Sequence, residues 1–187
     1  MSDVRLRLLA ASGLVIGAVL GVAGTFAPSA ALRGLAWGVD GTALIVAAAL
    51  LAVHHGRRGN DLAAAGFLLF VAGEALILSG AAMTLEASAP SFAAGVSLWA
   101  ASLVLVSASN TMPFVVRIVG FVAALLFAVV GVRIFVGEAL TPLSEPLPFY
   151  AYPFLAATLF GWAWVHYRAA IERPERSERP ERPERVI

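Results

Sequence analysis

Three ionisable residues lie inside long apolar stretches of the sequence: Asp40, Glu74 and Arg133. Glu74 stands in the middle of FVAGEALIL, a run that carries no other charge. A charged group at the centre of a bilayer costs about 2.5 to 3.5 kcal/mol even on the most lenient insertion scale. Such a side chain must face protein or water, pair with an opposite charge, or stay protonated. We therefore predict that these three residues line a substrate or proton path.

The depth of these residues can be estimated from the helical rise. From the expected outer ends of their helices, Asp40 lies about 9 Å deep, Glu74 about 15 Å and Arg133 about 5 Å. Because Asp40 and Arg133 are opposite in charge and share the outer half, we expect them to approach each other. The alternative is that the long Arg133 side chain extends to the outer membrane surface. Glu74 should face the protein interior. It either takes part in transport or is a neutral carboxyl group that hydrogen-bonds between helices.

The three histidines invite a haem hypothesis. His54 and His55 end the second apolar segment and His166 nearly ends the sixth, so all three are expected at a similar depth. Two histidines at one depth can ligate a haem iron, although histidines are also common near the C-termini of helices. We expect no cofactor and no metal site, and we keep haem ligation by these residues as an alternative.

Other chemistries find no support in the residues. The chain has no cysteine and no lysine, which excludes disulfides, thiolate metal sites and Schiff bases. No Gly-rich phosphate loop, metalloprotease motif or nucleophile elbow occurs. The net charge of +1 gives no reason to expect nucleic-acid binding. The sequence therefore favours a protein that is not an enzyme.

The elements that must position these residues are membrane-spanning helices. Of 187 residues, 60% are hydrophobic and only 13% are charged, and the apolar residues form long runs. In lipid, such runs must be helical to satisfy their backbone hydrogen bonds. We predict an all-α membrane protein with six transmembrane helices in an antiparallel bundle over residues 1–170, followed by a disordered Arg/Glu/Pro-rich cytoplasmic tail over residues 171–187. The six expected segments are 5–27, 34–53, 62–83, 92–109, 114–136 and 149–167.

The orientation follows from the distribution of arginine, which is enriched in cytoplasmic loops. One set of loops and ends carries Arg5, Arg7, Arg57, Arg58, Arg117 and Arg168. The opposite loops carry Arg33 alone together with Glu86, Glu138 and Glu145. We expect a multi-pass protein of the cell (inner) membrane with both termini in the cytoplasm. The first segment also has features of a cleavable signal peptide, a less favoured reading.

Two sets of glycines and a group of aromatic residues predict how the helices are placed. Gly13, Gly17 and Gly21 share one face of the first helix, and such faces allow close helix packing. A second set on the third helix has a spacing of seven residues: Gly66, Gly73 and Gly80. We expect these glycine faces to pack inside the bundle, with a subunit interface as the alternative, and we expect a homo-oligomer as the assembled form.

An aromatic belt at the two membrane surfaces is expected from Tyr150, Tyr152, Trp162, Trp164 and Tyr167.

One stretch resembles a known family. The run LLAVHHGRRGNDLAAAGFLLFVAGEALIL is similar to the second loop and third helix of the acetate/succinate permease family, with Arg58, Gly59 and Asn60 in its basic-Gly-Asn step. The family's Asn-Pro-Ala-Pro-Leu-Gly motif is missing, so no site residue is carried over. The urea/amide channel family is an equally loose comparison. Both resemblances imply uptake of a small solute through an oligomer of six-helix subunits.

These observations lead to a functional hypothesis with two alternatives. We expect an integral membrane channel or proton-coupled permease for a small polar solute, whose partners are the lipid bilayer and that solute. The first alternative is a scaffold or complex subunit that transports nothing. The second is a redox subunit that binds haem or quinone. A water-accessible cavity that reaches Glu74 would favour transport, whereas a dry, closed bundle would favour the scaffold.

Overall fold

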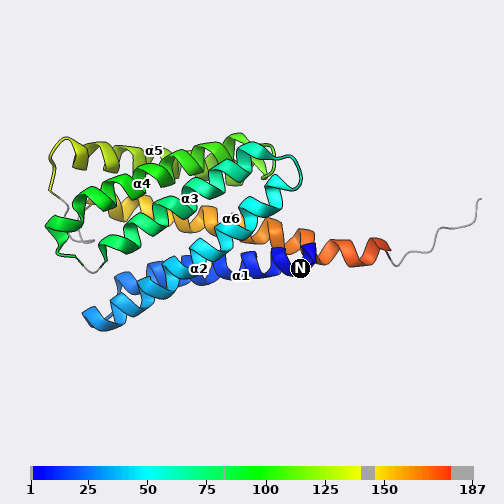
Figure 1. Ribbon diagram of the computed structural model, residues 1–187, viewed down its shortest axis with the longest axis horizontal. Helices are drawn as coiled ribbons and strands as arrows, with labels where there is room; N and C mark the ends of the chain where they lie inside the picture. The colour runs from blue at the N-terminus through cyan, green and yellow to red at the C-terminus, as the bar shows by residue number, and fades with distance from the viewer. Residues whose placement is uncertain (1, 82, 140–145, 178–187) are drawn as a thin grey trace, which may run out of the picture.

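The computed structural model describes residues 2–81, 83–139 and 146–177, and these residues are all-helical apart from short connections (Figure 1). Six helices follow one another along the chain: α1 (Asp3–Thr25), α2 (Ala30–Gly56), α3 (Asp61–Gly80), α4 (Leu85–Ala108), α5 (Phe114–Phe135) and α6 (Pro146–Ser177).

Five of the helices, α1 to α5, are long and apolar enough to cross a membrane. Helix α6 is longer but less apolar, because its sequence mixes Tyr, Trp, His and Pro with the aliphatic residues and ends in a charged segment. Large aliphatic side chains such as Leu9, Leu68 and Leu125 are more than half exposed on the outside of the bundle. An apolar outer surface of this kind is stable in lipid and not in water. The chain is therefore a membrane protein.

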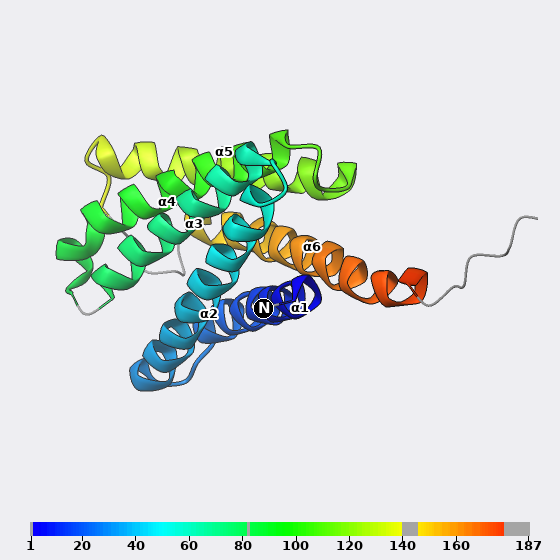
Figure 2. The same ribbon diagram turned by 45° about the vertical axis from the view of Figure 1, so that its right-hand side comes forward.

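The helices close into a ring. Each helix packs closely along its neighbours in sequence, and α6 also packs along α1; among the described residues no other pair of helices brings Cα atoms within 8 Å of each other. The end of α1 and the start of α2 lie apart from the end of α3 and the start of α4 in both views (Figures 1 and 2). The start of α1 lies at the same end of the bundle as the ends of α2 and α6. We call this end of the bundle the histidine end, and we call the other end of the bundle the opposite end.

Capping residues set several helix boundaries, and two of them differ from the sequence-based expectation. The Ser29 side chain accepts a hydrogen bond from the Leu32 N–H, so α2 starts at Ala30, earlier than expected. The Thr84 side chain caps α4 in the same way, and α3 ends at Gly80. The turn from α2 to α3 needs Gly59, whose φ of 70° suits glycine best.

The glycines of α1 and α3 lie against neighbouring helices. A Cβ added to Gly13 would lie 2.9 Å from the Ala43 carbonyl oxygen on α2, and one added to Gly73 would lie 2.8 Å from the Gly95 carbonyl oxygen on α4. Gly17 and Gly21 also face α2, and Gly66 and Gly80 face α4. Glycine therefore brings the backbones of α1 and α2, and of α3 and α4, close together.

The last helix extends beyond the expected membrane domain. Helix α6 continues to Ser177, so the first part of the segment expected to be a disordered tail is helical. The ion pair between Arg168 and Glu172, one turn apart at 3.0 Å, supports this extension. The rest of the expected tail, residues 178–187, lies outside the described residues.

Candidate functional site

Aromatic side chains fill the centre of the ring. Phe67 and Phe70 of α3 pack against Trp162 of α6, with ring centroids 5.0 and 6.0 Å away. Phe70 also stacks on Trp99 of α4, and Trp99 contacts Phe127 of α5. These centroid distances correspond to direct ring contact. The axis of the bundle is therefore closed by side chains and is not an open pore.

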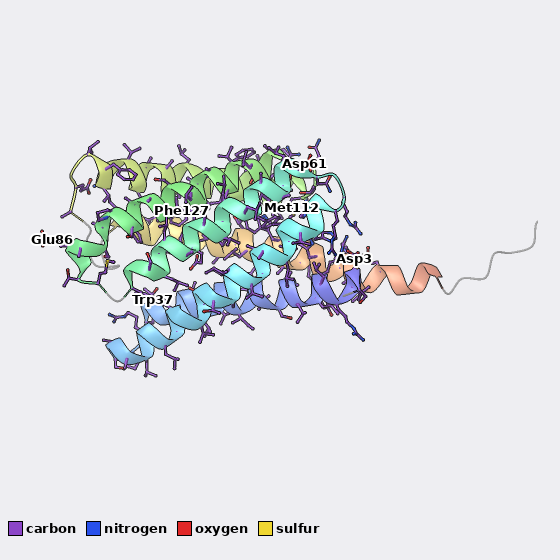
Figure 3. All side chains as sticks on the ribbon, in the orientation of Figure 1. Asp3, Trp37, Asp61, Glu86, Met112 and Phe127 are labelled. Carbon is purple, nitrogen blue, oxygen red and sulfur yellow. The ribbon has the colours of Figure 1, made fainter. Side chains whose placement is uncertain are left out.

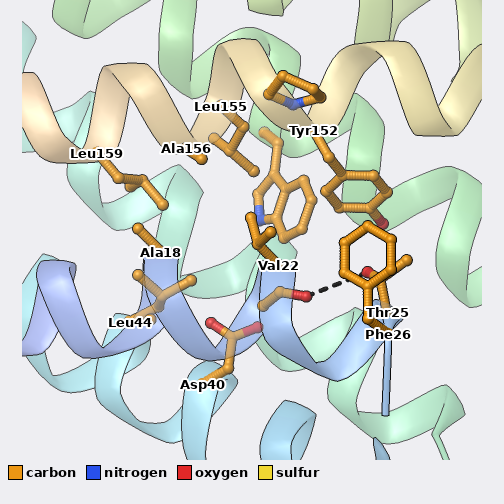
Figure 4. A pocket seen from close by; sticks show the side chains of 14 residues that line it. Ala18, Val22, Thr25, Phe26, Asp40, Leu44, Tyr152, Leu155, Ala156 and Leu159 are labelled. Carbon is orange, nitrogen blue, oxygen red and sulfur yellow. Dashed lines mark hydrogen bonds between the residues drawn. The ribbon is translucent and has the colours of Figure 1, made fainter. Parts of the chain in front are cut away.

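A cavity of about 170 Å³ lies beside this aromatic core, between α1, α2, α4 and α6. Its walls include Gly17, Gly21 and Thr25 of α1, Asp40 and Leu44 of α2, Trp99 of α4, and Tyr152, Leu155 and Leu159 of α6. Figure 4 shows Asp40 and Tyr152 on opposite sides of the cavity, with Val22 between them. Most of this wall is apolar, and Asp40 is its single ionisable acid among the residues that the structure describes.

Asp40 is placed by the close approach of α1 and α2. A Cβ added to Gly21 would lie 2.9 Å from Asp40 Oδ2, so a larger residue there would displace this carboxyl group. Asp40 Oδ1 is buried and has no hydrogen-bond partner among the described residues. The hydroxyl of Thr25 is occupied by its bond to the Gly21 carbonyl oxygen at 3.3 Å. The carboxyl group therefore offers a free acceptor at the cavity.

Glu74 lies behind Trp99 and is more buried than Asp40. Its side chain is only 3% exposed, and Oε2 has no hydrogen-bond partner among the described residues. The indole of Trp99 faces the Glu74 carboxyl group, but its Nε1 also lacks a partner within hydrogen-bonding distance. Asp40 and Glu74 are close enough for their charges to interact, and Tyr152 lies in the field of both. Trp99 thus stands between the cavity, which it lines, and Glu74.

The shifted helix boundaries change the depths of the two carboxyl groups. At 1.5 Å per residue, Asp40 lies about 15 Å along α2 from Ala30, and Glu74 about 9 Å along α3 from Gly80. The sequence-based depths had the opposite order. Both groups belong to one cluster in which the cavity reaches Asp40 and Trp99 but does not extend to Glu74.

The expected approach of Asp40 and Arg133 is wrong. Arg133 forms a two-point ion pair with Glu138, just past the end of its own helix. Helices α2 and α5 are not neighbours in the ring, and within the described part of the chain none of their Cα atoms lie within 8 Å of each other. The local pair forms because Glu138 follows Arg133 by five residues across a turn that Gly137, with a φ of 98°, allows. Arg133 is thereby separate from the cavity.

The structure brings the three histidines together at the histidine end. The rings of His54, His55 and His166 contact one another with centroids 5.2 to 5.8 Å apart, and all three side chains are buried. His54 Nδ1 lies 2.9 Å from Asp3 Oδ1. The other oxygen of Asp3 pairs with Arg58 at 2.9 Å and with Arg7 at 3.3 Å. Asp3, labelled in Figure 3, thus ties the start of α1 to the end of α2.

This histidine cluster does not fit the haem alternative. Ligands on the two faces of a haem have the macrocycle between them, whereas these rings pack edge to face against one another. His55 also stacks on Phe67, which connects the cluster to the aromatic core. Within the described residues, no group of three or more His, Cys, Asp or Glu side chains lies in metal-binding geometry.

Sequence reasoning missed the aromatic residues of the site. Tyr152 and Trp162 were expected in an aromatic belt, but Tyr152 lines the cavity and Trp162 is 1% exposed in the core. Trp164 and Tyr167 on the same helix are exposed. A helical pattern in α6 that places Tyr152, Leu155, Leu159 and Trp162 on one face is the signal that could have shown this. Nothing in the sequence around Trp99 marks it as a neighbour of Glu74.

Comparisons of the chain with models of protein families, with curated proteins and with solved structures found no match. The resemblance to acetate/succinate permeases and to urea/amide channels accordingly stays a prediction.

Proposed function

We propose that this membrane protein is a proton-coupled permease for a small polar solute, with the cavity at Asp40 as the solute site and Glu74 as a proton site. The observation that carries the proposal is a free carboxylate oxygen on the wall of a cavity inside a membrane protein. Ionisable groups are costly in this setting, and where they line a cavity they commonly serve ion or proton movement.

The closed axis favours a permease over an open channel. Because Phe70, Phe127 and Trp99 occupy the centre, a solute passes only when side chains or helices move. We expect the Trp99 side chain to move during transport, since it contacts the cavity on one side and faces Glu74 on the other. Its indole N–H has no hydrogen bond to hold it in place among the described groups.

The proposed topology has six spans with both termini in the cytoplasm. Helix α6 completes the ring by contacting both α1 and α5, and it carries buried residues along its length, such as Ala151, Leu159 and His166. A helix packed in this way beside five spanning helices crosses the bilayer with them. The arginine distribution supports a cytoplasmic location for the histidine end.

A flux survey in liposomes tests this function. The purified protein is reconstituted around a pH-sensitive dye, and gradients of small neutral, anionic and cationic solutes are applied in turn. We expect at least one solute to drive proton movement, and we expect Asp40→Asn to abolish it. Glu86→Gln, which removes an exposed carboxylate at the start of α4, is the matched control and should behave like the unchanged protein. Proton movement no faster than in protein-free liposomes for every solute would contradict the proposal and favour a scaffold.

A further inference from the structure

The charged groups at the cavity and directly behind its wall are acidic. Asp40 lines the cavity and Glu74 lies behind Trp99, whereas no Arg or His is part of the cavity wall. The ion pairs found among the described residues join Asp3, Glu138 and Glu172 to arginines or His54, and none includes Asp40 or Glu74. Two carboxyl groups thus share a low-dielectric region without a cation from the described chain. An ionised carboxylate there attracts a cation and repels an anion.

The rest of the wall suits a cation that carries alkyl groups. Trp99, Tyr152 and Phe26 place aromatic rings on the cavity, and aromatic faces attract ammonium groups, above all quaternary ones. Aliphatic side chains make up much of the remaining wall, including Val22, Leu44 and Leu159. A metal ion would need several oxygen ligands, but the wall provides one carboxylate. The combination of one acid, aromatic rings and aliphatic contacts favours an alkylated ammonium.

The volume limits the size of the ligand. An apolar cavity of about 150 Å³ holds a molecule of benzene. The cavity at Asp40, at about 170 Å³, therefore has room for a compact cation slightly larger than benzene. A sugar, a nucleotide or a peptide is too large.

We propose that the cavity binds a small alkylated ammonium cation, which pairs with Asp40 and packs against Trp99 and Tyr152. This inference rests on the proposed permease function and names its substrate class. Only the ionised form of Asp40 pairs with the ammonium group, so a proton on Asp40 weakens binding of the cation. The proton that transport exchanges for the cation is carried by Glu74.

Three probes of similar shape and different charge test the proposal by calorimetry on the purified protein. Choline is the cation, 3,3-dimethylbutan-1-ol is its neutral analogue, and 3,3-dimethylbutanoate is an anion of similar size. At alkaline pH, where protons compete least, choline should bind at least about tenfold more tightly than the alcohol, and the anion should not bind. This comparison uses the unchanged chain and does not depend on the folding of a variant.

A pair of variants then locates the site. Asp40→Asn should weaken choline binding by about tenfold or more, whereas Glu86→Gln should leave it unchanged.

Binding of the alcohol or the anion as tight as that of choline would overturn the inference, as would unchanged choline binding by Asp40→Asn. Proton movement driven only by neutral or anionic solutes would overturn the substrate class and leave the permease intact. Choline binding without any solute-driven proton movement would uphold the ligand class and remove the permease.

Discussion

Gly21 controls how closely the Asp40 carboxyl group approaches α1. The Cβ of an alanine at this position would lie 2.9 Å from Asp40 Oδ2, a contact that forces the carboxyl group to move. Because this carboxyl group is the end of a flexible side chain, it can turn away from α1, but it then leaves its position on the cavity wall. We therefore expect Gly21→Ala to weaken choline binding by roughly fivefold or more, measured by calorimetry.

Gly38→Ala is the matched control for this variant. Gly38 lies on α2, the helix that carries Asp40, and a Cβ there would meet nothing within 4 Å. Alanine in an open helical position stabilises a helix by about 0.5 to 1 kcal/mol relative to glycine. Gly38→Ala should keep choline binding intact. Equal binding by Gly21→Ala and Gly38→Ala would show that the position of Asp40 does not matter for the ligand.

At the scale of residues, sequence reasoning identified the carboxyl groups but not their surroundings. Asp40 and Glu74 stand out because charge inside an apolar run is costly wherever the helix lies. Which residues surround these carboxyl groups depends on how each helix is rotated and tilted. The hydrophobic periodicity of the sequence does not determine this when every face of a helix is apolar. The pairing of Asp40 with Arg133 was wrong for a related reason: a partner five residues away, Glu138, was available to Arg133 without any tertiary contact.

Helices α3 and α4 are held together by backbone contact at their glycines. Gly73 and Gly95 face each other, and a Cβ on Gly73 would lie 2.8 Å from the Gly95 carbonyl oxygen and 2.9 Å from the Trp99 ring. Backbone cannot move aside as a flexible side chain does. We expect Gly73→Ala to lower the stability by about 1 to 3 kcal/mol, seen as a lower midpoint of thermal unfolding in detergent.

The control for Gly73→Ala is Gly34→Ala, on an open face of α2 where a Cβ would meet nothing within 4 Å. Its unfolding midpoint should match or exceed that of the unchanged protein. A Gly73→Ala variant as stable as Gly34→Ala would mean that α3 and α4 do not pack at this distance.

At the scale of elements, the number and order of the helices could be predicted because apolar runs of this length have one stable form in lipid. The boundaries were less accurate. Ser29 and Thr84 cap helices that start before the continuous apolar runs. The earlier start of α2 and the end of α3 at Gly80, short of the expected residue 83, reversed the relative depths of Asp40 and Glu74. Cap residues next to Pro28 and in the α3–α4 connection are a sequence signal that could have shown this.

For the whole molecule, the absence of cysteine from the sequence allows a clean test of orientation. Gly56→Cys places a single thiol at the histidine end, and Ala31→Cys places one near the opposite end, without changing any charge. Both positions are exposed. We expect a membrane-impermeant maleimide added to intact cells to label Ala31→Cys and to spare Gly56→Cys. Labelling of Gly56→Cys from outside would place both termini on the other side.

We propose that the cavity at Asp40 binds the solute while Glu74 carries the proton. Because Glu74 is buried behind Trp99 and is not part of the cavity wall, its replacement should separate the two steps. Glu74→Gln keeps the shape of the side chain and its capacity for hydrogen bonds but cannot exchange a proton. Asp40→Asn, in contrast, should impair both binding and transport.

The most direct test measures choline binding and choline-driven proton movement on the same preparation of Glu74→Gln. We expect choline to bind within about twofold of its affinity for the unchanged protein, since the ligand pairs with Asp40. We also expect proton movement to fall to the rate of protein-free liposomes. Proton movement at the unchanged rate in Glu74→Gln would rule out Glu74 as the proton site and leave it only a packing contact between helices.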